Sequence, residues 1–240
     1  MVTRLPETAL HRDLAELVRS MRNAERRLFA DLDSAEYDAR SADGMAGKDF
    51  LAHLAAWRAV EARRMLAASG GPEVPPADPG IGAPLDETNA RIHAERAGWS
   101  WEAVEADAEA SADALLDAIG RSSSAVLCQC DDDIASVGVN AVNHAVAHLD
   151  DVALLFGRPE PYEAFVREVE AVLRRNHLPP RDSGVILYNV ACHHALAGDL
   201  PEARRLLRDA FARRPDLLAL ARDDADVAAL ASELDALAGG

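Results

Sequence analysis

The spacing of apolar residues is the feature that most constrains this chain. Through most of the sequence they recur every three or four residues, and alternating runs of β-branched residues are nearly absent. Such spacing places apolar side chains along one face of an α-helix, whereas a half-buried strand needs strict alternation. Because 49% of the 240 residues are hydrophobic, the chain can bury a sizeable core. The sequence therefore predicts a folded, all-α protein.

Glycine, proline and polar clusters interrupt this spacing and mark the expected helix ends. Long helices are expected over about 7–33, 48–68, 86–119 and 134–156, and shorter ones over about 161–176, 182–197, 201–213 and 224–237. Ser100 follows Gly98-Trp99 and can cap a new start, so we expect the third helix to bend there. The Gly- and Pro-rich stretch 69–84 is expected to be a long connection, either a lid or slack chain.

The length of the predicted helices changes near Arg158, because the helices before it are long and those after it are short. We therefore predict a four-helix bundle over 1–158 and a small helical segment over 159–240. Within that segment, VILYNVACHHALAGDLPEARRLLRDAFARRP resembles one tetratricopeptide unit, with alanines at close-packing positions and Gly198 at the turn. A single unit needs neighbours to bury its faces. We expect it to pack on the bundle, and partner docking is the alternative.

Histidines are the most suggestive polar residues of the predicted bundle. His144 and His148 are four residues apart in VNHAVAHLDD, so their side chains leave the same side of one helix. His53, in the second predicted helix, borders the apolar stripe of that helix and can complete one face of a metal site. The chain has eight histidines, and in a mostly helical protein one such pair is unsurprising. Spacing alone therefore also fits ordinary packed histidines.

Polar residues near these histidines are candidates to orient them or to line a cavity. Buried imidazoles need a partner on each ring nitrogen, and carboxylates or amides one turn away can provide it. We expect these partners and cavity residues to be Asp49, Trp57, Asn89, His93, Asn140 and Asp151.

The motif KDFLAHLAAW, a long third helix and HxxxH in the fourth helix together resemble the DinB-like superfamily of four-helix bundles. That superfamily includes the N-terminal domains of thiol-dependent isomerases and transferases, and the ClbS/DfsB self-resistance proteins. The resemblance covers about residues 5–157 and implies a divalent metal held by His53, His144 and His148. It also implies a homodimer. Met45 departs from the pattern, because relatives commonly carry tryptophan there.

The resemblance implies a metal-dependent transferase or hydrolase that detoxifies a small electrophilic or thiol-conjugated molecule, with a low-molecular-weight thiol as a further substrate. Three imidazoles suit zinc or nickel, and also iron, copper or cobalt. They leave a position open for water or thiol, and no protein residue is assigned as catalytic. Two alternatives stay open. One is a non-catalytic ligand-binding or sequestration protein whose tail docks a partner, and the other is a metal-free ClbS-like hydrolase.

Net charge and composition narrow the remaining functions. A net charge of −16 repels nucleic acid and anionic membranes. No stretch approaches the roughly 18 apolar residues of a membrane span, no secretory leader is evident, and nucleotide-binding motifs are absent. Three cysteines are too few for a disulfide framework, so we expect a cytoplasmic protein. Cys128-Gln129-Cys130 with the following aspartates is expected to be a solvated loop, and the carboxylates of 102–113 a solvated face.

Overall fold

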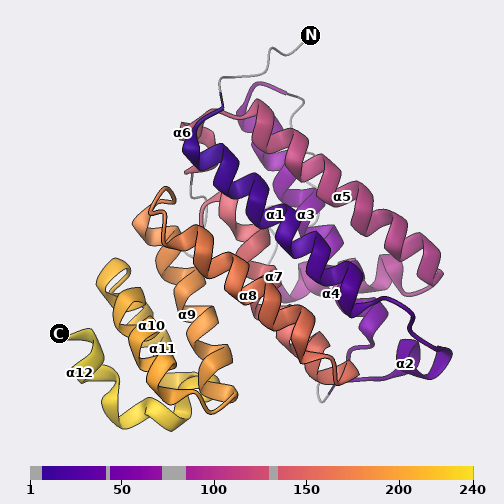
Figure 1. Ribbon diagram of the computed structural model, residues 1–240. Helices are drawn as coiled ribbons and strands as arrows, with labels where there is room; N and C mark the ends of the chain where they lie inside the picture. The colour runs from indigo at the N-terminus through magenta and orange to yellow at the C-terminus, as the bar shows by residue number, and fades with distance from the viewer. Residues whose placement is uncertain (1–6, 42–43, 72–84, 130–134, 240) are drawn as a thin grey trace.

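The computed structural model describes residues 7–41, 44–71, 85–129 and 135–239, and within these ranges the chain is helical (Figure 1). This confirms the predicted all-α fold class. The only β-type pairing in the described ranges is a single bridge between Arg40 and Ala46. None of the described helices is both long and apolar enough to cross a bilayer. Most of the 69–84 connection, and Cys130 with the aspartates after it, lie outside the described residues.

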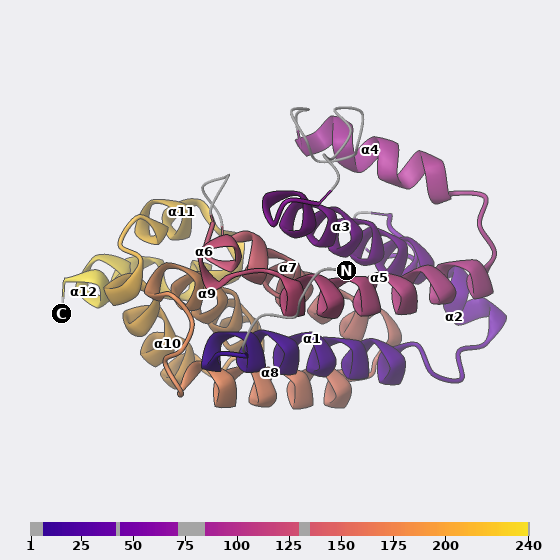
Figure 2. The same ribbon diagram turned by 90° about the horizontal axis from the view of Figure 1, so that it is seen from above.

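Four long helices build the body of the molecule: α1 (Ala9–Leu28), α3 (Gly47–Ala68), α5 (Trp101–Arg121) and α7 (Val137–Phe156). α3 is the central element, since it packs against both α5 and α7, and α1 also contacts both of those helices (Figure 2). Side chains such as Met21, Ala55, Leu115 and Val142 are fully buried between them. The apolar spacing seen in the sequence therefore becomes a continuous core.

The third predicted helix is two helices, as the Ser100 cap suggested. α4 (Leu85–Arg96) ends before Gly98, and the Ser100 hydroxyl accepts a hydrogen bond from the backbone N–H of Ala103 at 3.3 Å to start α5. The Lys48 ammonium donates to the carbonyl oxygens of Ala97 and Trp99 at 3.2 and 3.0 Å, which ties this link to the start of α3. α4 lies over α3 in Figure 2 and forms one wall of a cavity described below.

The first helix ends earlier than predicted. α1 stops at Leu28 because Asp31 adopts a left-handed φ of +53°, which an α-helix cannot continue through. A short helix, α2 (Ser34–Asp38), then starts from a capping box in which Asp33 and Glu36 satisfy each other's backbone N–H groups. The expected single helix over 7–33 was wrong at this end, and the turn places Phe29 and Tyr37 beside the start of α5.

The C-terminal segment wraps onto the bundle. Its elements are α8 (Pro159–Leu173), α9 (Pro180–Leu196), α10 (Leu200–Arg213), α11 (Leu217–Asp223), a 3₁₀ helix η1 (Ala225–Glu233) and α12 (Leu234–Ala238). Before this segment, the short helix α6 (Ser124–Leu127) precedes α7.

The C-terminal segment contacts the bundle through two helices: α8 packs along α1, and α9 packs on α7. The buried Asp182 carboxylate accepts from the N–H and hydroxyl of Ser136 at 2.8 and 2.7 Å, joining the starts of α7 and α9. One apolar core runs through both parts, and the division of the chain near Arg158 stays a prediction.

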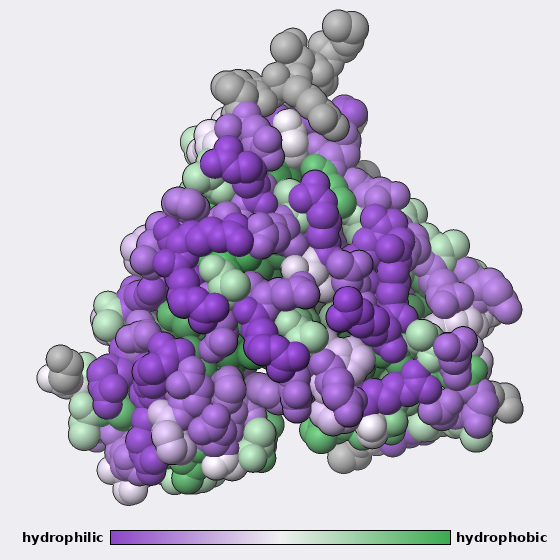
Figure 3. Space-filling view, in the orientation of Figure 1, coloured by the Kyte–Doolittle hydropathy of each residue, from purple (hydrophilic) through white to green (hydrophobic). Residues whose placement is uncertain are grey.

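The predicted helical hairpin of the tail is present, but the predicted last helix is not. Ala191, Ala203 and Ala210 are fully buried where α9 and α10 meet, and Gly198 has the φ of +80° that turns the chain between them. The expected helix over 224–237 is instead η1 followed by α12, because the Asp224 carboxylate takes up the N–H of Asp226 and starts a tighter turn. Hydrophilic side chains cover most of the face shown in Figure 3.

Candidate metal centre

Two helices bring the three predicted histidines together. His53 lies on α3, and His144 and His148 lie one turn apart on the neighbouring α7. The Nε2 atoms of His53 and His144 are 2.7 Å apart, and one ligand atom from each of the three imidazoles lies within 4.8 Å of the others. This geometry can hold a metal ion.

The environment keeps two of these imidazoles neutral. Burial, and then the nearby His148, lowers the pKa of His53 to about 4. Burial also lowers the pKa of His144 well below its usual range, with smaller contributions from the two other histidines and from Arg58. A metal binds the neutral imidazole, so both rings are in the form that ligation requires. The Nε2 atoms of His53 and His144 are 2.7 Å apart, so they must share one proton. A metal cation can take the place of that proton without either ring moving into solvent.

A cavity of about 420 Å³ opens onto the three imidazoles. Its apolar wall comes from Met45 and Ala52 on one side and from Ala90 and Ile92 of α4 on the other. The charged or polar residues at its border are Asp49, Asn89, His93 and Arg96. The size is in the range of small-molecule sites, and a mostly apolar wall with a few polar groups is typical of them.

Three of the predicted cavity residues border this space, and Trp57 lies next to them. The Trp57 indole N–H donates to Asn89 Oδ1 at 3.1 Å, which links α3 to α4 beside the triad. His93 Nε2 lies 3.5 Å from Asp49 Oδ2, and the same carboxylate accepts from the backbone N–H of Ala46 at 3.2 Å. Asp49 therefore caps the start of α3 and borders the cavity at the same time.

The two predicted partners on α7 differ in where they lie. Asp151 Oδ2 is 3.6 Å from His148 Nδ1, which is an electrostatic contact longer than a hydrogen bond. Asn140 lies one helical turn before His144, and its side-chain amide donates to Glu61 Oε1 at 2.9 Å rather than to a histidine of the triad. Met45, where the resemblance departs from its pattern, is part of the cavity wall.

A buried charged layer behind the triad was missed by sequence reasoning. Arg58 on α3 is 1% exposed and forms an ion pair with Glu25 of α1. Its guanidinium also donates to Ser111 Oγ at 3.1 Å and to the carbonyl oxygen of Ala108 at 3.3 Å. The signal in the sequence was a charged residue on the apolar side of LAHLAAWRAVEARRML, one turn and a half after His53. The layer fixes α3 against α1 and α5 and holds a positive charge near His144.

A second group of potential donor atoms lies at the junction of α9 and η1. Cys192, Asp224 and Asp226 each offer one ligand atom within 4.8 Å of the others. Cys192 and His193 both contact carboxylates of neighbouring elements. The Cys192 thiol donates weakly to Asp224 Oδ2 at 3.9 Å, and His193 Nδ1 lies 3.1 Å from Asp150 Oδ2 on α7.

Models of known protein families, curated protein sequences and solved structures give no match to this chain. The site therefore stands on its own geometry. Three imidazoles from two packed helices converge at the wall of a cavity, and burial holds two of them neutral. That arrangement can bind a divalent metal and present it to a small molecule.

Proposed function

We propose that this protein is a metal-dependent enzyme of the DinB-like class that acts on a small electrophilic or thiol-conjugated molecule. The observation that carries the proposal is the convergence of His53, His144 and His148 on a cavity large enough for such a molecule. The residue pattern around His53 and the HxxxH pair supports the class. Thiol transfer and hydrolytic detoxification are the two reactions that we favour.

The protein's own residues have separate tasks in this proposal. His53, His144 and His148 would hold the metal ion at the wall of the cavity. A bound divalent metal would supply Lewis acidity and would lower the pKa of a coordinated water or thiol. Trp57, fixed by its bond to Asn89, sets the position of α4 over the cavity, and the apolar wall excludes bulk water. Asp151 places a negative charge beside His148.

The test combines metal content with turnover. Protein purified without a histidine tag should contain about one equivalent of a divalent metal, measured by elemental mass spectrometry. His148→Ala should lose that metal, and the rate at which a low-molecular-weight thiol displaces chloride from 1-chloro-2,4-dinitrobenzene should fall by more than about a hundredfold. His177→Ala is the matched control, because His177 lies elsewhere and contacts Asp13. A wild-type protein without stoichiometric metal, and with activity unaffected by His148→Ala, would contradict the proposal.

One observation favours a second candidate, the metal-free hydrolase. His93 and Asp49 form a histidine–carboxylate pair at the border of the same cavity, with 3.5 Å between Nε2 and Oδ2. Such a pair can take a proton from a water molecule without a metal. In that case activity would survive chelation and His148→Ala but would be lost in His93→Gln.

A further inference from the structure

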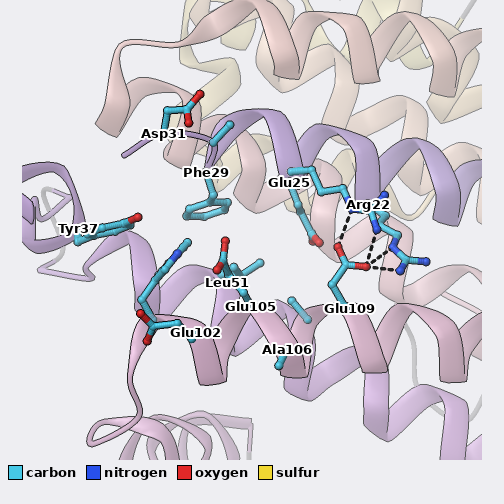
Figure 4. Close-up of a pocket in the computed structure, with 14 residues that line it drawn as sticks. Arg22, Glu25, Phe29, Asp31, Tyr37, Leu51, Glu102, Glu105, Ala106 and Glu109 are labelled. Atoms are coloured by element: carbon cyan, nitrogen blue, oxygen red, sulfur yellow. Dashed lines mark hydrogen bonds and ion pairs between the residues drawn. The ribbon is translucent and has the colours of Figure 1, made fainter. Parts of the chain in front are cut away.

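A second large groove lies on the other side of α3. It has a volume of about 480 Å³, and α1, α2, α3 and α5 contribute to its wall (Figure 4). Leu51 of α3 lines this groove, whereas His53 faces the metal centre. Two residues along an α-helix are about 200° apart, so the two spaces occupy opposite faces of α3. The groove is therefore a separate feature of the molecule.

Aromatic rings form one wall of this groove. The ring of Trp101, at the start of α5, lies between Phe29 and Tyr37, with centroid separations of 5.4 and 4.8 Å. All three residues line the groove. The rings are tilted against one another by 39° and 36°, so the three side chains pack as one aromatic cluster at this wall. The faces of such rings carry negative electrostatic potential, which attracts cations.

The ionic groups at the other end of the groove are already paired. Arg22 and Arg26 of α1 both bind the Glu109 carboxylate, with the Arg26 contacts at 2.6 and 2.7 Å (Figure 4). Arg22 also binds Asp113 at 2.7 Å. Glu102, Glu105 and Asp113 are exposed, so the expected solvated face is present, and it also carries these ion pairs. The two arginines are held by carboxylates, so neither is left to attract an anion.

Three lining carboxylates remain without a cationic partner. Asp31, Glu102 and Glu105 form no ion pair with any residue in the described ranges. Glu102 accepts hydrogen bonds from its own backbone N–H and from the Ser100 hydroxyl, and these lower its pKa. In Figure 4 the Glu105 carboxylate points into the space beside the Phe29 ring, between the aromatic wall and the Glu109 cluster. Glu105 therefore places a negative charge beside the aromatic rings, and Asp31 and Glu102 add to the negative charge of the groove wall.

We propose that this groove binds a small organic cation that carries a quaternary or methylated ammonium group. Such a cation is weakly hydrated and gains from contact with aromatic faces, while carboxylates nearby balance its charge. The net charge of −16 further raises the local concentration of cations around the protein. The aromatic wall and the unpaired carboxylates lie on the same groove, so one ligand can contact both. This proposal does not depend on the metal centre.

Choline and its uncharged isostere, 3,3-dimethylbutan-1-ol, form the direct test. Titration of the full-length protein, followed by tryptophan fluorescence and by ligand NMR, should show saturable binding of choline. The isostere has the same shape without the charge, and its binding should be weaker by about tenfold or more. Equal binding of both compounds, or no binding of choline, would overturn the proposal. Spermidine that binds while choline does not would overturn it too, because the aromatic wall would then play no part.

Substitutions locate the binding to this groove. Glu105→Gln should weaken choline binding by about fivefold, and Trp101→Leu by about tenfold. Glu168→Gln, an exposed position on α8, is the matched control and should leave the affinity unchanged. His144→Ala should also leave it unchanged, which separates this groove from the metal centre. Because Glu105 is exposed, its variant should fold normally, and unchanged choline affinity in Glu105→Gln would overturn the assignment of the groove.

Discussion

Helix α7 separates two clusters of potential metal donors that look alike by distance. On one side, His144 and His148 meet His53 of α3. On the other side, Asp150 contacts His193 of α9, next to the cluster of Cys192, Asp224 and Asp226. In both clusters the three ligand atoms lie within 4.8 Å of one another. Proximity alone therefore does not distinguish them.

The two clusters differ in their protonation and in the space in front of them. In the first cluster burial keeps His53 and His144 neutral, and the three imidazoles face a cavity of about 420 Å³. In the second cluster Asp224 already accepts from the Tyr188 hydroxyl at 2.6 Å and from the N–H of Asp226 at 2.9 Å, and the adjoining space is only about 110 Å³. Burial and Asp224 raise the pKa of the Cys192 thiol, so it stays protonated. The first cluster is open to a metal, whereas the second is an internal hydrogen-bonded joint.

The largest effect is expected from the ion pair behind the histidines. Arg58→Met should lower the free energy of unfolding by about 3–5 kcal/mol, because Glu25 would be left buried without its cation. Arg204→Met in the tail is the control: its bond to Glu233 is substantially exposed, so the loss should stay below about 1 kcal/mol. The free energies are measured by denaturant unfolding. An equal decrease in both variants would contradict the expectation that the buried ion pair stabilises the protein more than the exposed one.

Zinc titration compares the two donor clusters directly. His144→Ala should weaken zinc binding by more than about a hundredfold, since it removes one of three ligands. Cys192→Ser should leave the zinc affinity unchanged, because its thiol is protonated and already bonded. If Cys192→Ser reduced zinc binding and His144→Ala did not, the assignment of the two clusters would be reversed.

The free energy of unfolding should depend on pH because His53 is neutral in the folded protein. The pKa of His53 is about 4 in the folded chain and near 6.5 when unfolded, so between these values the unfolded state binds more protons. In chelator-treated protein the free energy of unfolding should therefore fall as the pH drops from about 6.5 to 4. The contribution of His53 is on the order of 2 kcal/mol. His53→Gln should show a correspondingly flatter profile, and an identical profile would contradict this explanation.

The smallest effect concerns the joint itself. Tyr188→Phe removes a donor from the Asp224 carboxylate and should lower the free energy of unfolding by about 2 kcal/mol, without changing zinc affinity. Tyr162→Phe is the matched control, because its hydroxyl donates to an uncharged acceptor, the carbonyl oxygen of Val146, at 2.7 Å. Its loss should be nearer 1 kcal/mol. A zinc affinity that changed in Tyr188→Phe would indicate that the joint and the metal centre are coupled.

Sequence reasoning located most helices because their apolar spacing and caps are local. α3 was expected over 48–68 and is Gly47–Ala68, and the Ser100 cap was found where it was predicted. The ends of α1 and of the tail were missed. These helix ends depend on the left-handed conformation of Asp31 and on the turn that Asp224 starts. The spacing of apolar residues predicts neither of these features.

Buried and partly exposed residues alternate along α7 in a way that one apolar stripe does not describe. The side chain of His148 is 33% exposed, while Leu149 beside it is fully buried. The reason is that α7 packs on two sides, against α1 and α3 and against α8 and α9. A helix buried on two sides has no single stripe, and the histidines lie at the border of one buried face where the cavity opens.

The sequence by itself determined the all-α class, the positions of most helices and the i, i+4 spacing of His144 and His148, because these follow from local periodicity. Tertiary structure decided that His53 meets that pair, that Arg58 and Glu25 lie behind it, and that Cys192 is bonded into a joint. It also decided that aromatic rings and unpaired carboxylates share one groove. These are contacts between residues far apart in the chain, and the packing of whole helices sets them.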